Sequence, residues 1–167
     1  MTSATYPSEF SSLHRLTLPE DDYDLDKHLV RILYIFTSPR SVIIRITNAR
    51  PDSSMQQGGT LKTCVAAMSN ARDGNAVSSI LFDECETSEA GISSDSDVAY
   101  SISRMVSAKF GCSLVVLYGL SRFPSILTYV QPDSEENEKR PKKTRVLLAT
   151  VLTQIISHDL DDILSKQ

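Results

Sequence analysis

Six carboxylate side chains lie between residues 83 and 97, and they are the densest group in this chain that could do chemistry. They are Asp83, Glu84, Glu86, Glu89, Asp95 and Asp97. Paired carboxylates can exchange protons with a substrate or hold a metal ion. No histidine, lysine or arginine lies between these six to set their ionisation, and the segment is rich in serine. This composition favours a solvated loop, with a docking surface for a basic partner as the alternative.

Other residues with chemical potential lack the spacing that known sites require. The histidines are His14, His28 and His158. None has a second histidine at the i, i+4 spacing of a helical zinc site. No G-x-S-x-G motif occurs, and Gly58 and Gly59 lack the spacing of a phosphate-binding loop. Counting from Asp22, Lys27 occupies the position where a calcium-binding EF-hand loop requires glycine. We therefore expect no catalytic, metal-binding or cofactor-binding residue and no enzyme activity.

Composition and charge indicate one ordinary globular domain. Of the 167 residues, 41% are hydrophobic and 23% are charged, and the net charge is −4. A negative net charge argues against broad nucleic-acid binding, which needs a basic surface. No apolar run approaches the roughly 18 residues of a membrane span, and the first residues have no basic start followed by an apolar core. We therefore expect no membrane anchor and no secretory signal.

The cysteines and one basic run bear on the compartment. Cys64, Cys85 and Cys112 are odd in number and widely spaced, which favours reduced thiols. The run KRPKKTR at 139–145 has the composition of a nuclear import signal, and the alternative is a linker balanced by the preceding glutamates. We expect a cytoplasmic protein, which also enters the nucleus if that run is an import signal.

A strand and a helix are expected to flank the acidic segment. Residues 77–82 and 114–118 are short apolar runs with the length of buried strands. Between them, residues 95–110 carry apolar side chains at helical spacing, such as Val98 and Ile102. This order permits a parallel crossover if both strands lie in one sheet.

Further strands and a final helix are predicted on either side of this unit. Residues 28–36 and 41–47 read as a hairpin that turns at Pro39. The alternation in 61–68 favours a strand, and 126–130 is a short strand candidate. Leucines and isoleucines at steps of three and four near the end of the chain predict an amphipathic helix.

These elements predict an α+β fold built on a mainly antiparallel sheet or sandwich of about six strands. The two helices are expected at roughly 95–110 and 144–165. Residues 1–12 are expected to be a loose N-terminus, and 13–167 a single domain. Long loops are expected at 48–60, 83–95 and 131–143.

Several segments resemble the fourth proteasome assembly chaperone of eukaryotes, in a fungal-type version with longer loops. They are Ser12-Leu13-His14, the hairpin at 28–47, LKTCVAAM at 61–68, VSSILFD at 77–83, the helix containing Ala99, Ile102 and Arg104, and SLVVLYGL at 113–120. The resemblance covers roughly residues 12–160, and its motifs are diffuse apolar patterns without a catalytic signature. The loops at 48–60, 70–76 and 131–143 exceed those of the short animal form.

The resemblance implies a non-enzymatic role. Members of this family are similar in fold to the third assembly chaperone, pair with it as a heterodimer, and bind alpha-type subunits of the proteasome core particle. They guide formation of the alpha ring and leave before the particle matures. The resemblance implies no ATP, metal or cofactor. A longin- or profilin-like trafficking or scaffold module is the alternative, because it would share the sheet-and-helix architecture.

We expect the partner interface to involve Val42, Ile44 and Ile46 on one strand, or their neighbours Ile43 and Arg45. A slip of one residue exchanges the two faces of a strand, so the pattern alone does not choose between these sets. The acidic residues Asp83, Glu84 and Glu86 are expected to add to the interface.

Overall fold

The structure is a computed structural model that describes residues 6–16, 29–49, 60–70, 74–84, 94–120, 126–130 and 143–166. Most of each loop expected at 48–60, 83–95 and 131–143 lies outside these residues, as does the start of the basic run at 139–145. Within the described ranges, no helix is long and apolar enough to cross a membrane.

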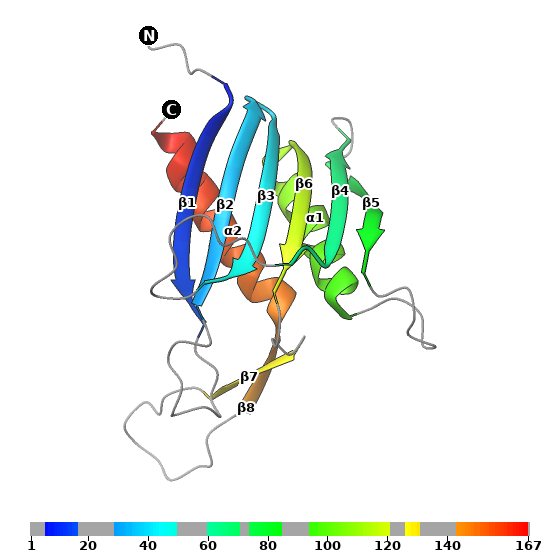
Figure 1. Ribbon diagram of the computed structural model, residues 1–167, viewed down its shortest axis with the longest axis vertical. Coiled ribbons are helices and arrows are strands. Elements are labelled where there is room, and N and C mark those ends of the chain that lie inside the picture. The colour runs from blue at the N-terminus through cyan, green and yellow to red at the C-terminus, as the bar shows by residue number, and fades with distance from the viewer. Residues whose placement is uncertain are drawn as a thin grey trace.

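The described residues form eight strands and two helices (Figure 1). The strands are β1 (Ser8–Arg15), β2 (Leu29–Ser38), β3 (Ser41–Asn48), β4 (Thr63–Ser69), β5 (Ala76–Asp83), β6 (Ser113–Gly119), β7 (Ile126–Val130) and β8 (Lys143–Leu147). The helices are α1 (Ser94–Phe110) and α2 (Leu148–Ser165).

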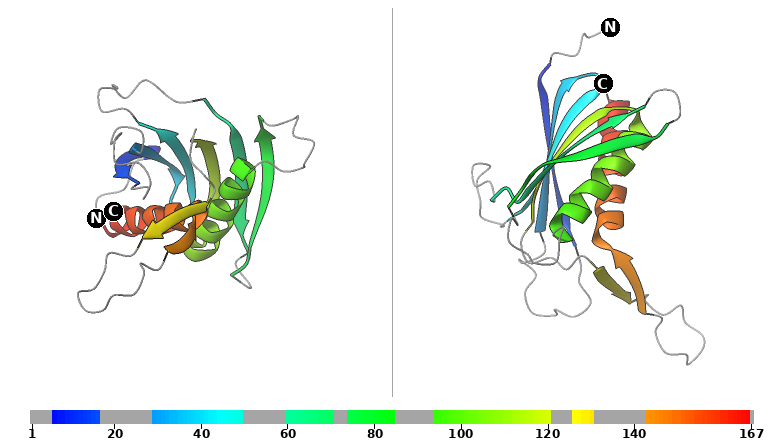
Figure 2. Two further views of the ribbon diagram at one scale, coloured as in Figure 1. Left: turned by 90° about the horizontal axis from the view of Figure 1, so that it is seen from below. Right: turned by 90° about the vertical axis from the view of Figure 1, so that its right-hand side faces the viewer.

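Six strands form one sheet in the order β1-β2-β3-β6-β4-β5. All neighbouring pairs are antiparallel except β3 and β6, which run parallel. β7 and β8 pair with each other in a separate two-stranded sheet. Both helices pack on the same face of the six-stranded sheet (Figure 2). The predicted α+β class is confirmed, and a helix layer on one side of a single large sheet replaces the alternative of a sandwich.

The strands on either side of the acidic segment share a sheet but are not neighbours. β4 lies between β5 and β6 and pairs antiparallel with both. β5 and β6 therefore run in the same direction, and α1 connects them while packing against β4, β5 and β6. The parallel neighbour of β6 is β3, a pairing that the sequence pattern did not identify.

The ends of α1 follow from local chemistry. Asp95 and Asp97 lie in its first turn and Lys109 in its last, so these charges complement the helix dipole at both ends. Gly111 follows with a φ of 60°, the left-handed conformation that ends many helices and that glycine adopts without strain.

Two boundaries correct the sequence-based predictions. β1 begins at Ser8, so the last residues of the segment expected to be loose form the edge of the sheet. α2 begins at Leu148 and not near residue 144, because 143–147 form β8, which pairs with β7. Both differences arise from strand pairing between distant segments.

The hydrophobic core lies between the helices and the sheet. Alternation along β2, β3 and β6 directs every second side chain into this layer, where α1 and α2 cover it. The largest fully buried side chains include Ile32, Tyr34, Ile44, Ile46, Ile102, Leu114, Tyr118, Leu148, Leu152, Ile156 and Leu160.

Candidate functional site

The sheet face opposite the helices, which we name the open face, is covered by no described helix or strand (Figure 2). Strand register aligns its side chains in rows across the sheet. One row contains Ile35, Ile43, Val115 and Ala66. The next contains Leu33, Arg45, Leu117, Cys64 and Phe82. The open face is therefore mostly apolar from β2 to β5.

Exposure on the open face increases toward the β5 edge. Ile43 and Val115 on the central strands are half-buried by their neighbours in the sheet. Nearer the edge, Met68 is 66% exposed, Val77 70% and Phe82 46%. Met68 and Val77 are cross-strand neighbours, and an exposed apolar group of this kind is typical of surfaces that bind another protein.

The interface residues expected from the sequence divide between the two faces. Val42, Ile44 and Ile46 are 3%, 0% and 0% exposed, because they lie in the core under the helices. Ile43 and Arg45 alternate with them and lie on the open face, where both are half-buried. This corrects the choice of face: a surface contact on β3 belongs to Ile43 and Arg45.

The open face has the dimensions of a protein interface. Six strands about 4.8 Å apart, each about seven residues long, span roughly 600–700 Å² in projection. A standard interface buries about 800 Å² of accessible surface on each partner. Because side-chain relief makes accessible area larger than projected area, one partner sheet could cover most of this face.

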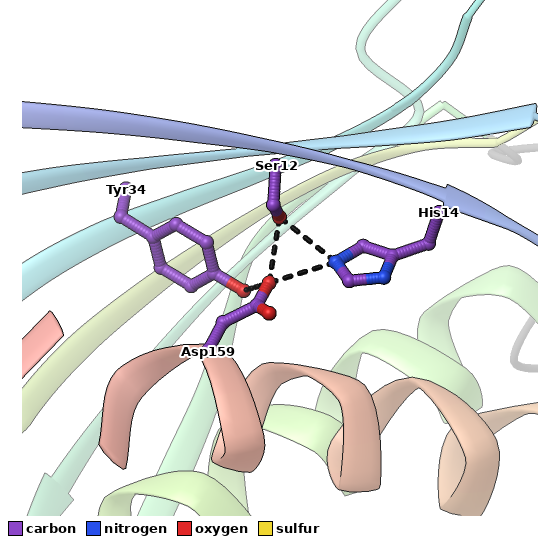
Figure 3. Close-up of polar contacts among 4 residues, drawn as sticks. All are labelled: Ser12, His14, Tyr34 and Asp159. Carbon is purple, nitrogen blue, oxygen red and sulfur yellow. Dashed lines mark hydrogen bonds and ion pairs between the residues drawn. The ribbon is translucent and has the colours of Figure 1, made fainter. Parts of the chain in front are cut away.

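On the opposite side of the sheet, four polar side chains join β1, β2 and α2 (Figure 3). Asp159 Oδ2 in α2 accepts a 2.6 Å hydrogen bond from Ser12 Oγ and a 2.7 Å hydrogen bond from the Tyr34 hydroxyl. His14 Nε2 lies 2.9 Å from the same oxygen and 3.0 Å from Ser12 Oγ. One carboxylate oxygen thus holds the edge strand β1 and its neighbour β2 to the last helix.

The electrostatics of this group keep Asp159 charged. Burial alone would raise the pKa of the Asp159 carboxyl, but the hydrogen bonds from Ser12, Tyr34 and His14, with the charge of His14, outweigh it and lower that pKa. For Tyr34, burial and the adjacent Asp159 carboxylate raise the pKa, so its hydroxyl keeps its proton.

Ser12, His14 and Asp159 are the residue types of a hydrolytic triad, but their geometry differs from one. In a triad, the histidine accepts the serine proton at one nitrogen and donates from the other to the carboxylate. Here His14 Nε2 faces both Ser12 and Asp159 Oδ2. A carboxylate only accepts, so Nε2 carries a hydrogen and cannot take one from Ser12. The group is suited to fastening β1 onto α2.

The acidic residues near α1 divide into anchored and exposed ones. Asp83 accepts hydrogen bonds from Thr63 Oγ1, at 3.3 Å, and from Ser96 Oγ, which ties the end of β5 to β4 and α1. Asp95 pairs with Lys62 at 3.0 Å. Glu84 and Asp97 are exposed.

Glu86 and Glu89 lie outside the described residues. Glu84 is therefore the described member of the expected interface set Asp83, Glu84 and Glu86 whose side chain is open to a partner.

Metal and thiol chemistry receive no support from the described residues. No group of three or more His, Cys, Asp or Glu side chains among them could hold a metal ion. Burial raises the pKa of the Cys64 and Cys112 thiols, which keeps them in the less reactive protonated form. A pocket of about 40 Å³ lined in part by Phe36, Phe110 and Leu160 has room for a few water molecules and is far smaller than typical ligand sites.

Sequence reasoning missed most of the open face, although one signal for it was present. LVRILYIF in β2, SVIIRI in β3 and SLVVLY in β6 are nearly continuous apolar runs. Such runs are typical of strands covered on both faces, whereas strands with one face in solvent alternate between apolar and polar residues. The Asp159 group had no such signal, because its members are up to 147 residues apart.

Comparison with solved structures found a likeness in fold at low sequence identity. No family model and no curated protein matches this chain. A chain from the crystal structure of a novel chaperone complex for yeast 20S proteasome assembly is similar over 93% of this chain and 93% of that one. The two are 11% identical in sequence, with a TM-score of 0.43. Values this low do not establish a shared function.

Proposed function

We propose that this chain is a non-enzymatic chaperone subunit for assembly of the proteasome core particle. It pairs as a heterodimer with a related small chaperone similar to the third assembly chaperone, and the pair promotes formation of the alpha ring. This proposal includes a cytoplasmic location, with entry into the nucleus if the run at 139–145 is an import signal.

The observation that carries the proposal is that the central strands have more apolar surface than the described helices bury. β2, β3 and β6 have apolar side chains on both faces, and the described helices cover one face. A second sheet of similar composition would complete the burial and form a two-sheet sandwich between subunits. The sequence resemblance to the assembly chaperone family supports the same proposal, because the segments that carry this resemblance form β2, β3, β4, β5 and β6.

The mechanism requires surfaces and no reaction. A chaperone that binds a nascent alpha-type subunit covers one of its contact surfaces and so restricts which neighbour can join it. A later subunit that competes for the covered surface displaces the chaperone. Selection of this kind depends on differences in affinity and on steric exclusion.

Co-purification tests the proposal. Tagged full-length chain isolated from its own cells should bring down a similarly sized α+β protein together with alpha-type proteasome subunits. Recovery of vesicle-coat or membrane-tether proteins in their place would support a longin- or profilin-like module and overturn the proposal. Material isolated with the tag on an unrelated small protein provides the background.

A further inference from the structure

The two edges of the six-stranded sheet differ in their protection against added strands. β1 carries Glu9 and Arg15, and charged side chains on an edge strand oppose pairing with another chain. β5, at the other edge, has no charged residue from Ala76 to Phe82. Among the described residues, no strand pairs with the outer side of β5.

The apolar side chains of β5 are unusually exposed for an edge strand. Val77 is 70% exposed, Leu81 63% and Ile80 40%. An uncharged, apolar edge of this length attracts strand pairing, which native proteins normally suppress. The contrast with β1 indicates that the outer edge of β5 is suited to pair with an added strand, whereas β1 is protected from such pairing.

Hydrogen-bond alternation identifies the backbone groups that point outward. The Asn70 N–H donates a 2.7 Å hydrogen bond to the Asn75 carbonyl where the β4–β5 hairpin turns. In an antiparallel pair, successive residues alternate between bonding the partner and pointing away from it. Val77 and Ser79 therefore bond β4, whereas Ser78 and Ile80 direct N–H and C=O groups outward.

A β-bulge ends the stretch of β5 whose N–H and C=O groups point outward, which we name the accepting edge. The β4–β5 register shifts between Cys64 and Val65, so that Ile80 and Phe82 lie opposite neighbouring residues of β4. Bulges bend a strand and often end pairing. The accepting edge is therefore the stretch from Ala76 to Ile80, which pairs with about five residues of an added segment. About four further residues of an antiparallel segment, on its N-terminal side, are needed to pass the bulge and reach Glu84.

Side chains beside this edge indicate what the segment should contain. On the helix side, Ser103 of α1 contacts Ser78 at 3.2 Å, and Tyr100, 36% exposed, lies one turn earlier in α1. Val77 is available on the open-face side. Beyond the bulge, Glu84 and Asp97 are exposed and acidic. Ile80, opposite the core residue Val65, is 40% exposed on the helix side, and Val77 is 70% exposed on the other. These two side chains favour apolar residues on both faces of the segment, and Glu84 favours a basic residue at the end beside it.

We propose that the outer edge of β5, from Ala76 to Ile80, binds an extended segment of another protein by strand addition, and that this segment is apolar with a lysine or arginine beside Glu84. Main-chain hydrogen bonds would supply affinity and the alternating side chains would supply specificity. The outward N–H and C=O groups of β5 lie in the plane of the sheet and not on the open face, so the proposal goes beyond the proposed function and does not depend on it.

Amide hydrogen exchange tests the proposal directly on the full chain. The probe is a synthetic decapeptide of valine, isoleucine and threonine with two lysines at its N-terminus, which antiparallel addition places beside Glu84. At saturating probe, exchange of the Ser78 and Ile80 amides should slow at least tenfold, whereas the Val77 and Ser79 amides, already bonded to β4, should change little.

Two outcomes of that experiment overturn the proposal. Unchanged exchange at Ser78 and Ile80 would exclude strand addition. If both amides are already protected without probe, in proportion to protein concentration, the occupant is a second copy of this chain. A version of the peptide with proline at alternate positions serves as the control and should leave exchange unchanged.

Variants separate the backbone from the side chains. Ile80→Pro removes an outward N–H and should weaken probe binding at least tenfold in fluorescence anisotropy, whereas Ile80→Val retains the N–H and should bind within threefold of wild type. Equal weakening by both would contradict the proposal.

A charge exchange remains informative even if Ile80→Pro does not fold. Glu84→Lys should weaken the lysine-ended probe severalfold and strengthen a glutamate-ended one. An unchanged order of affinities would show that Glu84 does not lie beside the bound segment. Ile43→Asp on the open face should leave probe binding intact, so failure at the edge and failure of the heterodimer can be told apart.

Discussion

The Tyr34 hydroxyl in β2 donates a 2.7 Å hydrogen bond to Asp159 Oδ2 in α2, across 125 residues of sequence. Ser12 donates to the same oxygen, and His14 contacts it from the edge strand. The helix that closes the core is thereby fastened to the first two strands of the sheet. The opposite face of those strands remains available to a partner.

Replacement of Tyr34 by phenylalanine should destabilise the fold. The variant retains the ring but loses a hydrogen bond to a charged acceptor, an interaction worth about 1.5–3 kcal/mol. We expect a loss of that order in the free energy of unfolding, measured by urea denaturation. Tyr100→Phe, on the exposed side of α1, is the matched control and should change the free energy by less than about 0.5 kcal/mol. Equal effects of the two variants would show that the bond to Asp159 contributes nothing.

Stability should fall in acid because of Asp159. Its pKa in the folded protein is lower than in the unfolded chain, so the charged carboxylate stabilises the fold at every pH above the unfolded value of about 3.9. This contribution is lost as the pH falls below about 4 and through the folded pKa. The difference in unfolding free energy between wild type and Asp159→Asn should therefore shrink between pH 5 and pH 2. A difference independent of pH would contradict this assignment.

Stability should also fall in alkali because of Tyr118. Burial, with the nearby Asp95 charge, raises the pKa of this hydroxyl in the folded state. Its contribution is complete below the unfolded pKa of about 10 and is lost as the pH rises toward the folded value. Tyr118→Phe should remove part of the decline measured between pH 9 and pH 11. If wild type and variant decline equally, the hydroxyl is ionised as easily in the folded state as in the unfolded one.

The end of β6 leaves no room for a side chain at Gly119. A Cβ placed there would lie 2.4 Å from the Thr60 carbonyl oxygen, which is backbone and cannot rotate away. Gly119→Ala should destabilise the fold by about 1–3 kcal/mol. Exchange of the Lys62 amide, which donates to the Tyr118 carbonyl, should become faster. Ser113→Ala at the start of the same strand is the control, and a loss as large as that of Gly119→Ala would refute the steric explanation.

Local patterns predicted most elements because their signals are short in range. The β2–β3 hairpin followed from two apolar runs around Pro39, and α1 from its apolar spacing and terminal charges. β1 was missed because its helix-facing side chains include Ser12 and His14, which meet Asp159 in place of an apolar core. A polar strand that pairs with a distant segment has no periodic signature of its own.

The face of β3 could not be chosen from the sequence for a related reason. Val42, Ile44 and Ile46 on one side and Ile43 on the other are all apolar, so alternation does not distinguish the core from the surface. The choice is made by the helices, which pack on the side of Ile44. The same ambiguity is informative. A strand with apolar side chains on both faces is stabilised when both faces are buried against another layer.

The most direct measurement of the central claim is a quantitative pull-down that compares Ile43→Asp with a matched variant, Met105→Asp, which places the same charge at a 39% exposed apolar position on α1. Both proteins should first be shown to be folded by circular dichroism. We expect Ile43→Asp to recover at least tenfold less of the small chaperone partner than wild type does. Met105→Asp should recover as much partner as wild type. If Ile43→Asp recovers the partner as well as wild type does, the open face is not the heterodimer interface.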